Sequence, residues 1–320
     1  MLVRSLSQIV KWGRCMRRPV LQLSTPGLQS TRKASATSLK ERRIRDLVVP
    51  VPHGYLAGRQ WGPDDGQPIL ALHGWQDNAA SFENLVPLLK SEFQVVALDF
   101  SGHGLSSHIP SSCSYSRDQY LDDVRRTADY LQWDTFSIVG HDMGAGTGYF
   151  FAVLFPERVS RLISIEGTFP ASYANKASCS QHHIDDRRYT EEEMLDIFRA
   201  RHVSEEAAKT IMARGSTRTA EGHHIRNDDV RVRDAEPDNV FPGLFDRGLS
   251  RFRNSLLVVS KELGLLDSSS SKVATAEALM MCVGAEMCAK FKYVSVGGSH
   301  HVHLEAPDKV APHVNDFLCT

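Results

Sequence analysis

The chain has 320 residues, of which 42% are hydrophobic and 23% are charged, a composition typical of a globular protein with one large α/β domain and an insertion. Its formal net charge of −1 gives no support for binding to nucleic acid or to a charged membrane surface. The longest apolar runs fall short of the roughly 18 residues that a transmembrane helix needs, so the sequence predicts no membrane span.

The first 45 residues are basic and rich in serine. Residues 1–45 contain eleven Lys or Arg and one acidic residue, Glu41. Leu2, Leu6 and Ile9 recur at near-helical spacing among the basic residues, which is typical of an amphipathic mitochondrial transit peptide. We therefore predict a leader over 1–45 and a mitochondrial location. The alternative is a disordered basic tail on a cytoplasmic or peroxisomal protein.

The cysteines are scattered without paired spacing. This pattern favours reduced thiols in an intracellular protein over a disulfide framework or a zinc site. The six positions are Cys15, Cys113, Cys179, Cys282, Cys288 and Cys319.

Order is expected to begin with a hairpin. Two strand-like runs, 46–51 and 54–62, are separated by Pro-His-Gly and predict an antiparallel pair. The apolar run 68–74 ends in a turn, as expected of a buried parallel strand. Residues 80–92 follow with helical spacing. A buried strand with a glycine loop over 93–107 and an amphipathic helix over 116–133 come next.

A strand, a tight turn and a helix follow over 135–155, and another strand over 159–167. This alternation predicts a mostly parallel, doubly wound sheet with helices on both faces. The alternation of strands and helices is interrupted at 168–250, a polar, helix-forming stretch without a clear core strand. It returns with strands at 254–264 and 291–298 and helices at 272–288 and from about 308. We therefore predict a core of 46–167 and 251–320, with 168–250 as a helical cap over the ligand-binding edge of the sheet.

The turn at 140–144 has the spacing of a nucleophile elbow. Gly140 and Gly144 flank Asp142, and a turn this sharp between strand and helix leaves no room for side chains at its flanks. The residue at the tip must tolerate a strained backbone. The sequence therefore places Asp142 where a catalytic nucleophile is expected.

The loop after the strand 68–74 is expected to supply an oxyanion donor. In this arrangement one backbone N–H comes from that loop and the other from the residue after the nucleophile. We therefore predict that the N–H groups of Trp75 and Met143 form the oxyanion hole. His73 is expected to order the loop without transferring protons, and it is also a candidate for the lining of the substrate site.

The catalytic base is expected after the last strand, within Gly-Gly-Ser-His-His-Val-His. His300 stands seven residues before Pro307, the spacing common for this base, and His301 and His303 fit less well. His300 and His303 could instead chelate a metal ion. No carboxylate stands at ligand spacing beside them, so we predict no metal and no cofactor.

A third group must orient the base. Glu166 ends the buried strand 159–167 and is the preferred acid, and Asp267, after the strand 254–264, is the second candidate. Tyr173 and Tyr189 lie in the cap and could, together with His73 and Trp75, contact a small-molecule substrate. Most tyrosines at such positions simply pack, so this lining is an open expectation. The sequence does not predict the oligomeric state.

At these motifs the chain resembles the α/β-hydrolase superfamily and, more narrowly, the serine hydrolase-like proteins of animals. The resemblance rests on LHGWQDNAASFENLVPLL, ALDFSGHGLSSH, FSIVGHDMGA, ARGSTRTAEG, RNDD and GSHHVHLEAP, which together span essentially everything after the leader. It implies the α/β-hydrolase fold, an inserted cap and a hydrolase with a nucleophile–His–acid triad acting on a small organic molecule.

Asp142 departs from that family, which usually has serine at this place. Aspartate here is the mark of haloalkane dehalogenases and epoxide hydrolases of the same fold. Glu166 stands four residues before Pro170, a spacing that one subgroup of dehalogenases shares. Dehalogenases, however, commonly have Trp and Asn where this chain has Met143 and Trp75. Epoxide hydrolases commonly have Pro where this chain has Gln76.

Two classes of function remain open from the sequence. The preferred one is a hydrolase that forms a covalent ester on Asp142 and hydrolyses it with His300 and Glu166, with epoxide or carbon–halogen bonds as specific alternatives. The other is a catalytically silent binding protein that has kept the fold, for which the change from Ser to Asp would be a simple route.

Overall fold

The computed structural model describes residues 44–167, 187–201, 203–234, 254–261 and 288–320. Residues 1–43 of the predicted leader, the candidate residues Tyr173 and Asp267, and residues 272–287 of the predicted helix lie outside these ranges, whereas Ile44 and Arg45 of the predicted leader belong to the first strand.

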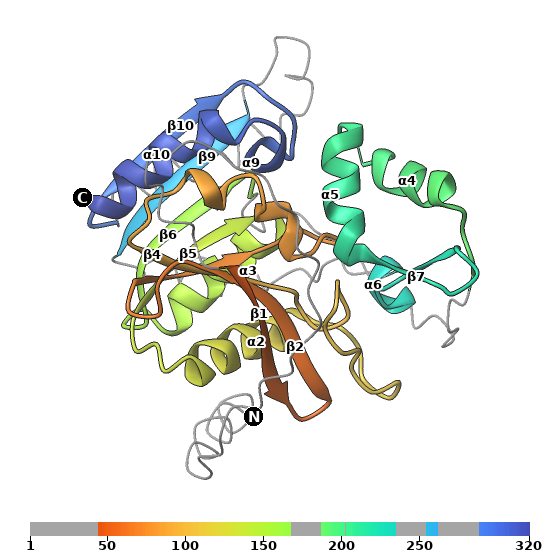
Figure 1. Cartoon of the computed structure of the whole chain (residues 1–320). Coiled ribbons are helices and arrows are strands. Elements are labelled where there is room, and N and C mark those ends of the chain that lie inside the picture. The colour runs from red at the N-terminus through yellow and green to blue at the C-terminus, as the bar shows by residue number, and fades with distance from the viewer. Residues whose placement is uncertain (1–43, 168–186, 202, 235–253, 262–287) are drawn as a thin grey trace. The chain divides into compact units, whose positions relative to one another are not determined.

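The centre of the described chain is an eight-stranded sheet (Figure 1). Its strands are β1 (Ile44–Val51), β2 (Gly54–Trp61), β3 (Gln67–Leu72), β4 (Phe93–Leu98), β5 (Phe136–His141), β6 (Val159–Ile165), β9 (Ser255–Lys261) and β10 (Phe291–Val296). Their order is β1-β2-β4-β3-β5-β6-β9-β10. β2 runs antiparallel to β1 and β4, and the other neighbours are parallel. The predicted hairpin and the mostly parallel sheet are confirmed.

Both faces of the sheet are covered by helices. Successive residues of a strand point to opposite faces, so each strand contributes side chains to two apolar clusters. Leu70 and Leu72 of β3 pack in one apolar cluster with residues of α2 (Arg117–Tyr130) and α3 (Met143–Leu154). Ile69 and Ala71 pack in a second cluster with residues of α10 (Pro307–Cys319). This three-layer arrangement leaves the carboxyl edge of the parallel strands free to carry a site.

The prediction of an α-helix over 80–92 is wrong. The segment instead forms two 3-10 turns, η1 (Ala79–Phe82) and η2 (Val86–Leu88). Pro87 lies at the start of η2, where its ring and missing N–H prevent an α-helix from running through. Phe82 and Val86 are nevertheless buried in the second cluster. The apolar spacing therefore predicted correctly which side chains are buried, although the segment is not an α-helix.

The described part of the cap contains helices and one short hairpin. Its elements are α4 (Glu191–Arg199), α5 (Glu205–Gly215), β7 (Ser216–Arg218), β8 (His224–Arg226) and α6 (Val230–Asp234). Three-residue strands carry too few positions to show alternation, which explains why β7 and β8 were not predicted. Met194, Phe198 and Ile211 bury the inner faces of α4 and α5 in a cluster that also includes Leu304 of α9 (Val302–Glu305).

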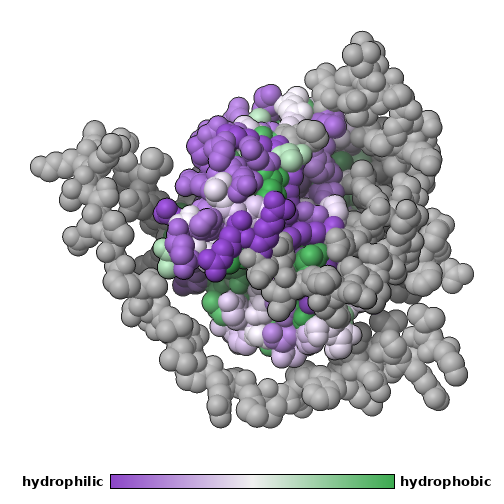
Figure 2. Space-filling model, turned by 90° about the vertical axis from the view of Figure 1, so that its right-hand side faces the viewer, coloured by the Kyte–Doolittle hydropathy of each residue, from purple (hydrophilic) through white to green (hydrophobic). Residues whose placement is uncertain are grey.

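The outer surface of the cap is polar. Figure 2 shows the side of the molecule on which α4, α5 and α6 lie, and its described residues are predominantly hydrophilic. α4 begins with three glutamates, and Thr190 closes a capping box with Glu193. No helix in the described ranges is long and apolar enough to cross a membrane.

Polar contacts fasten the cap to the loops that follow β3 and β4. Arg214 of α5 pairs with Asp99 at 2.6 Å, and both side chains are buried. The Asn78 side-chain amide donates to the Ile211 carbonyl at 2.9 Å. Asp99 follows β4, and Asn78 lies in the loop after β3. The cap therefore lies over the carboxyl edge of the parallel strands.

Candidate active site

Asp142 occupies the tip of a sharp turn between β5 and α3. Its φ of 47° and ψ of −114° are strained for a residue with a side chain. Its own N–H donates to the Ile165 carbonyl at 3.1 Å, and its carbonyl accepts from Gly146 N–H at 3.1 Å. These two bonds hold the strained backbone. The carboxylate thus stands at the N-terminus of a 12-residue helix, where an anion is favoured.

The flanking glycine of this turn is required by space. A Cβ added at Gly144 would lie 2.1 Å from the Leu72 carbonyl oxygen, which is a severe clash with the backbone of β3. A Cβ added at Gly146, two residues further along α3, would meet nothing within 4 Å. The glycine at 144 lets α3 start directly against the end of β3, and this close approach brings Asp142 beside the loop that follows β3.

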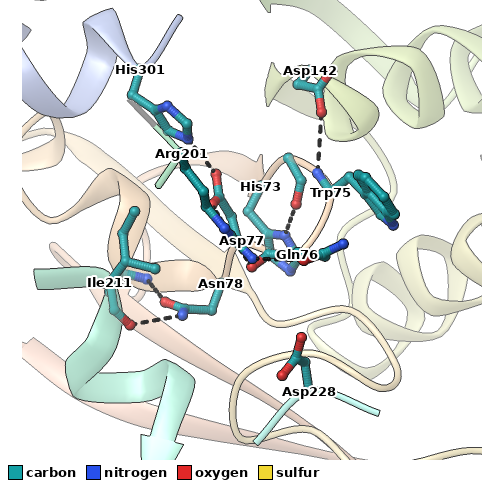
Figure 3. A network of polar contacts seen from close by, with 12 residues as sticks. His73, Trp75, Gln76, Asp77, Asn78, Asp142, Arg201, Ile211, Asp228 and His301 are labelled. Carbon is teal, nitrogen blue, oxygen red and sulfur yellow. Dashed lines mark hydrogen bonds and ion pairs between the residues drawn. The ribbon is translucent and has the colours of Figure 1, made fainter. Parts of the chain in front are cut away.

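The loop after β3 donates a hydrogen bond to Asp142. The backbone N–H of Trp75 lies 3.2 Å from Asp142 Oδ2, as Figure 3 shows. The predicted oxyanion donor at Trp75 is therefore aimed at the carboxylate itself. The indole Nε1–H of Trp75 donates to the Val232 carbonyl at 3.0 Å, so this second N–H group of Trp75 is already hydrogen-bonded within the protein.

His73 holds the shape of this loop. Its side chain is fully buried, Nδ1 donates to the Gly74 carbonyl at 2.7 Å, and Nε2 accepts from Phe100 N–H at 3.1 Å. Burial lowers the pKa of His73, which keeps the ring neutral. Both ring nitrogens are engaged, one by Gly74 and the other by Phe100 after β4. Its role is to position the loop that carries Trp75.

Glu166 and His300 come together from distant parts of the chain. His300 Nδ1 lies 3.5 Å from Glu166 Oε2. The Glu166 side chain is 7% exposed, whereas that of His300 is 44% exposed and faces outward. Glu166 follows β6 with a positive φ of 49°, its N–H donates to the Val259 carbonyl at 2.9 Å, and its Oε1 accepts from Lys261 N–H. These bonds fix the carboxylate beneath the imidazole.

The electrostatic setting favours the charged form of His300. Burial alone lowers the pKa of His300, but the hydrogen bond with Glu166 and the charge of Asp142 outweigh it. The resulting pKa lies above the ordinary value of histidine. The ring is thus held with Nδ1 on Glu166, which leaves Nε2 to exchange a proton with a water or a substrate atom.

Sequence reasoning missed a buried polar cluster beside these residues. Asp77 Oδ2 accepts from His301 Nε2 at 3.1 Å and lies 3.6 Å from His141 Nδ1. Burial would raise the pKa of Asp77, but the nearby His301 and the guanidinium of Arg201 hold it well below its usual range. Asp77 stands two residues after Trp75 and His141 directly precedes Asp142, so proximity to the motifs was a usable signal.

The cap residue Arg201 reaches into the same loop. Its guanidinium pairs with Asp77 Oδ1 at 3.0 Å and donates to the carbonyl and the side-chain oxygen of Gln76 (Figure 3). Gln76 has a positive φ of 59° and follows the donor residue Trp75. Arg201 therefore ties the cap to the loop that carries Trp75. No local sequence signal links position 201 to this loop.

The remaining candidates contribute less. Tyr189 is buried in the apolar cluster of the cap, and its backbone bridges to His224. It therefore packs within the cap. His303 is fully buried and its ring lies 4.2 Å from that of His141, centroid to centroid. Burial holds the pKa of His303 well below its usual range. It serves as a neutral packing residue under the loop of His300.

Comparisons with known proteins agree with this architecture. Residues 67–189 match the family described as the alpha/beta hydrolase fold. The chain is 32% identical to the serine hydrolase-like protein of Danio rerio over 92% of this chain and 94% of that protein.

Two solved structures superpose closely. The crystal structure of a hypothetical protein from Pseudomonas aeruginosa has a TM-score of 0.69 at 30% identity, over 85% of this chain and 97% of that one. E-2-(acetamidomethylene)succinate hydrolase has a TM-score of 0.61 at 21% identity, over 87% of this chain and 100% of that one. The chain is thus a hydrolase of the α/β-hydrolase fold, and it belongs to the serine hydrolase-like family of that superfamily.

Proposed function

We propose that this hydrolase uses Asp142 as a carboxylate nucleophile, with His300 as base and Glu166 as the acid that orients it. The observation that carries the proposal is the hydrogen bond from Trp75 N–H to Asp142 Oδ2. In a serine enzyme the oxyanion donors must reach a carbonyl of the substrate. In a carboxylate enzyme they must reach the nucleophile's own carboxyl oxygen, which is the contact present here.

The first step forms an ester on the enzyme. Oδ1 of Asp142 attacks an sp³ carbon of a small organic substrate, and the bond from that carbon to a halide or to an epoxide oxygen breaks. The leaving atom takes the electron pair, and an epoxide oxygen also takes a proton. Because a carboxylate is already ionised at neutral pH, this attack needs no general base.

The second step hydrolyses that ester. His300 Nε2 takes a proton from water, and the resulting hydroxide attacks Cγ of Asp142. Negative charge then develops on Oδ2, where the N–H of Trp75, together with that of Met143, stabilises it. The tetrahedral intermediate collapses, the alkoxide of the product leaves, and it takes the proton back from His300. Asp142 is left as the carboxylic acid and releases its proton to solvent, which restores the carboxylate. Glu166 holds the imidazole and stabilises its charged form throughout.

The site offers little to a free halide. The indole N–H of Trp75 is bonded to the Val232 carbonyl, and Met143 replaces the tryptophan that dehalogenases commonly place after the nucleophile. Tyr189 packs inside the cap, which leaves Tyr173 as the tyrosine candidate for protonating an epoxide oxygen. Epoxides are therefore the first substrate class to test, and alkyl halides the second.

A trapping experiment tests the proposal directly. A His300→Gln variant keeps the nucleophile and lacks the base, so it should form the ester and fail to release it. After incubation with a strained aryl epoxide, mass spectrometry of the peptide that contains Asp142 should show an adduct with the mass of the epoxide. His313→Gln, a histidine of α10, serves as the matched control and should turn over without accumulating adduct. Absence of adduct in His300→Gln, with no wild-type turnover of esters, epoxides or alkyl halides, would rule the proposal out.

A further inference from the structure

Three buried side chains beside the elbow place ligand atoms around one point. Asp77, His141 and His301 each offer one ligand atom within 4.8 Å of the other two, and each residue is at most 5% exposed. Carboxylate and imidazole together are the donor set that divalent transition metals prefer. We propose that Asp77, His141 and His301 form a binding site for Zn²⁺ or a similar divalent transition-metal ion.

The spacing of the atoms supports this assignment. Bonds of about 2.0–2.1 Å from Zn²⁺ to nitrogen and oxygen place neighbouring tetrahedral ligands roughly 3.3 Å apart. Asp77 Oδ2 lies 3.1 Å from His301 Nε2 and 3.6 Å from His141 Nδ1. These two separations bracket the tetrahedral value, so small side-chain rotations suffice to close the site around an ion.

His141 presents a free lone pair to the site. Its Nε2 donates to the His300 carbonyl at 2.9 Å, so Nδ1 carries no proton. Within the described residues Nδ1 has no hydrogen-bond partner although it is buried. A buried acceptor without a partner costs free energy, and a metal ion would satisfy it. Gly74 keeps this nitrogen accessible, because a Cβ there would lie 2.8 Å from it.

Further contacts orient the three ligands, as metal sites require. Arg201 holds Asp77 Oδ1 at 3.0 Å, which leaves Oδ2 for the ion (Figure 3). The His300 carbonyl fixes the tautomer of His141. The positive charge of Arg201 opposes that of the ion, so we expect reversible binding and not a permanently loaded site. When the metal takes the lone pair of His301 Nε2, the neutral ring carries its proton on Nδ1 and no longer donates to Asp77.

The proposed ligands differ from the pair that the sequence suggested. His300 and His303 were the chelating candidates there, yet His300 faces Glu166, and His303 is not among the three residues that converge. The metal site adjoins the proposed nucleophile, base and acid but uses none of them as a ligand. Its occupancy can therefore be measured without substrate, and the outcome does not depend on the ester mechanism.

Metal titration of the tag-free full-length protein, first stripped with a chelator, tests the site. Addition of Co²⁺ should produce the visible absorption of a tetrahedral ion with nitrogen and oxygen ligands at one equivalent, and Zn²⁺ should abolish that absorption. Mg²⁺ should not abolish the Co²⁺ absorption, because Mg²⁺ prefers oxygen ligands. His141→Gln and His301→Gln should each weaken Co²⁺ binding by about 100-fold, whereas His313→Gln should leave it unchanged.

Several results would overturn the assignment. One is the absence of saturable binding of Co²⁺ or Zn²⁺ to the wild type. Another is binding of equal strength by the wild type, His141→Gln and His301→Gln. Circular dichroism must show that both variants are folded. If either is not, X-ray absorption of the Zn²⁺-loaded wild type decides the matter. Two imidazoles and a carboxylate at about 2.0 Å support the site, and a sulfur ligand or fewer than two imidazoles contradict it.

Discussion

A carboxylate at the tip of the elbow changes which oxygen receives the stabilising hydrogen bond. With Asp142 the N–H of Trp75 is already directed at Oδ2 of the proposed nucleophile. That donor is therefore in place before the substrate arrives and needs no reorganisation during ester hydrolysis. The strained φ of 47° that holds Asp142 in this position would hold a serine equally well. The choice of chemistry thus depends on one side chain in an otherwise common frame.

Replacing the carboxylate of Asp142 by a serine hydroxyl should change the reaction from epoxide or alkyl halide turnover to ester hydrolysis. In Asp142→Ser the Trp75 N–H becomes available to a substrate carbonyl, and His300 with Glu166 can activate the hydroxyl. We expect hydrolysis of a p-nitrophenyl ester to appear and turnover of an epoxide or alkyl halide to fall by about 10³-fold or more. Both rates are measured spectrophotometrically, with Asp142→Asn as the inactive control. Retention of epoxide turnover by Asp142→Ser would contradict Asp142 as nucleophile.

At the scale of elements, the start of α3 against β3 determines where Asp142 lies. A methyl group at position 144 clashes with the Leu72 carbonyl, and one at 146 meets open space. We expect Gly144→Ala to lower the free energy of unfolding by roughly 3 kcal/mol or to prevent folding, as overpacking against backbone does. Gly146→Ala should raise it by about 0.5–1 kcal/mol through helix propensity. Urea denaturation of both variants checks the pair, and equal stabilities would show that α3 does not approach β3 this closely.

Helix α2 carries a buried acid that couples stability to pH. Asp123 accepts from Ser101 N–H at 2.8 Å and from Gln119 at 2.9 Å, yet burial raises its pKa to about 7. The folded state therefore keeps a proton on Asp123 up to about pH 7, whereas the unfolded chain loses it near pH 4. Because the folded state binds more protons in this range, the contribution of Asp123 to stability falls as pH rises through 7.

An Asp123→Asn variant isolates this effect, because the amide does not ionise. The free energy of unfolding of wild type minus that of the variant should fall by about 1 kcal/mol between pH 6 and pH 8. Taking the difference cancels the titration of other groups, including the buried histidines. Urea denaturation at several pH values measures it. A difference that stays constant across this range would mean that Asp123 is already ionised at pH 6 in the folded protein.

At the scale of the whole described molecule, the cap and the sheet are joined through buried charges. Arg214 pairs with Asp99 where both side chains are at most 5% exposed, whereas Arg199 pairs with two exposed acids of α4 and with the exposed Glu205 of α5. Arg214→Ala leaves the charge of Asp99 buried and should cost about 3–5 kcal/mol of unfolding free energy. Arg199→Ala should cost less than about 1 kcal/mol. Thermal or urea denaturation compares the two, and similar losses would contradict the buried junction.

The sequence predicted the sheet well because each central strand is a buried apolar run bounded by turns. It failed at 80–92, where Pro87 overrides helical spacing, and at β7 and β8, which are too short to show alternation. The sharp turn at Asp142 and the neighbouring loop after β3 could be predicted because they are local motifs. The buried cluster of Asp77, His141 and His301 joins three distant segments, and only the fold brings its members together.

The source of the oxygen atom in the product tests the central claim most directly. During a single turnover of an epoxide or alkyl halide in H₂¹⁸O, water attacks Cγ of Asp142, and the product keeps an oxygen from the carboxylate. We predict unlabelled product and a gain of about 2 Da, one ¹⁸O, on the peptide that contains Asp142. Product labelled with ¹⁸O in the first turnover, with no label on that peptide, would show that water attacks the substrate directly and would contradict a covalent ester on Asp142.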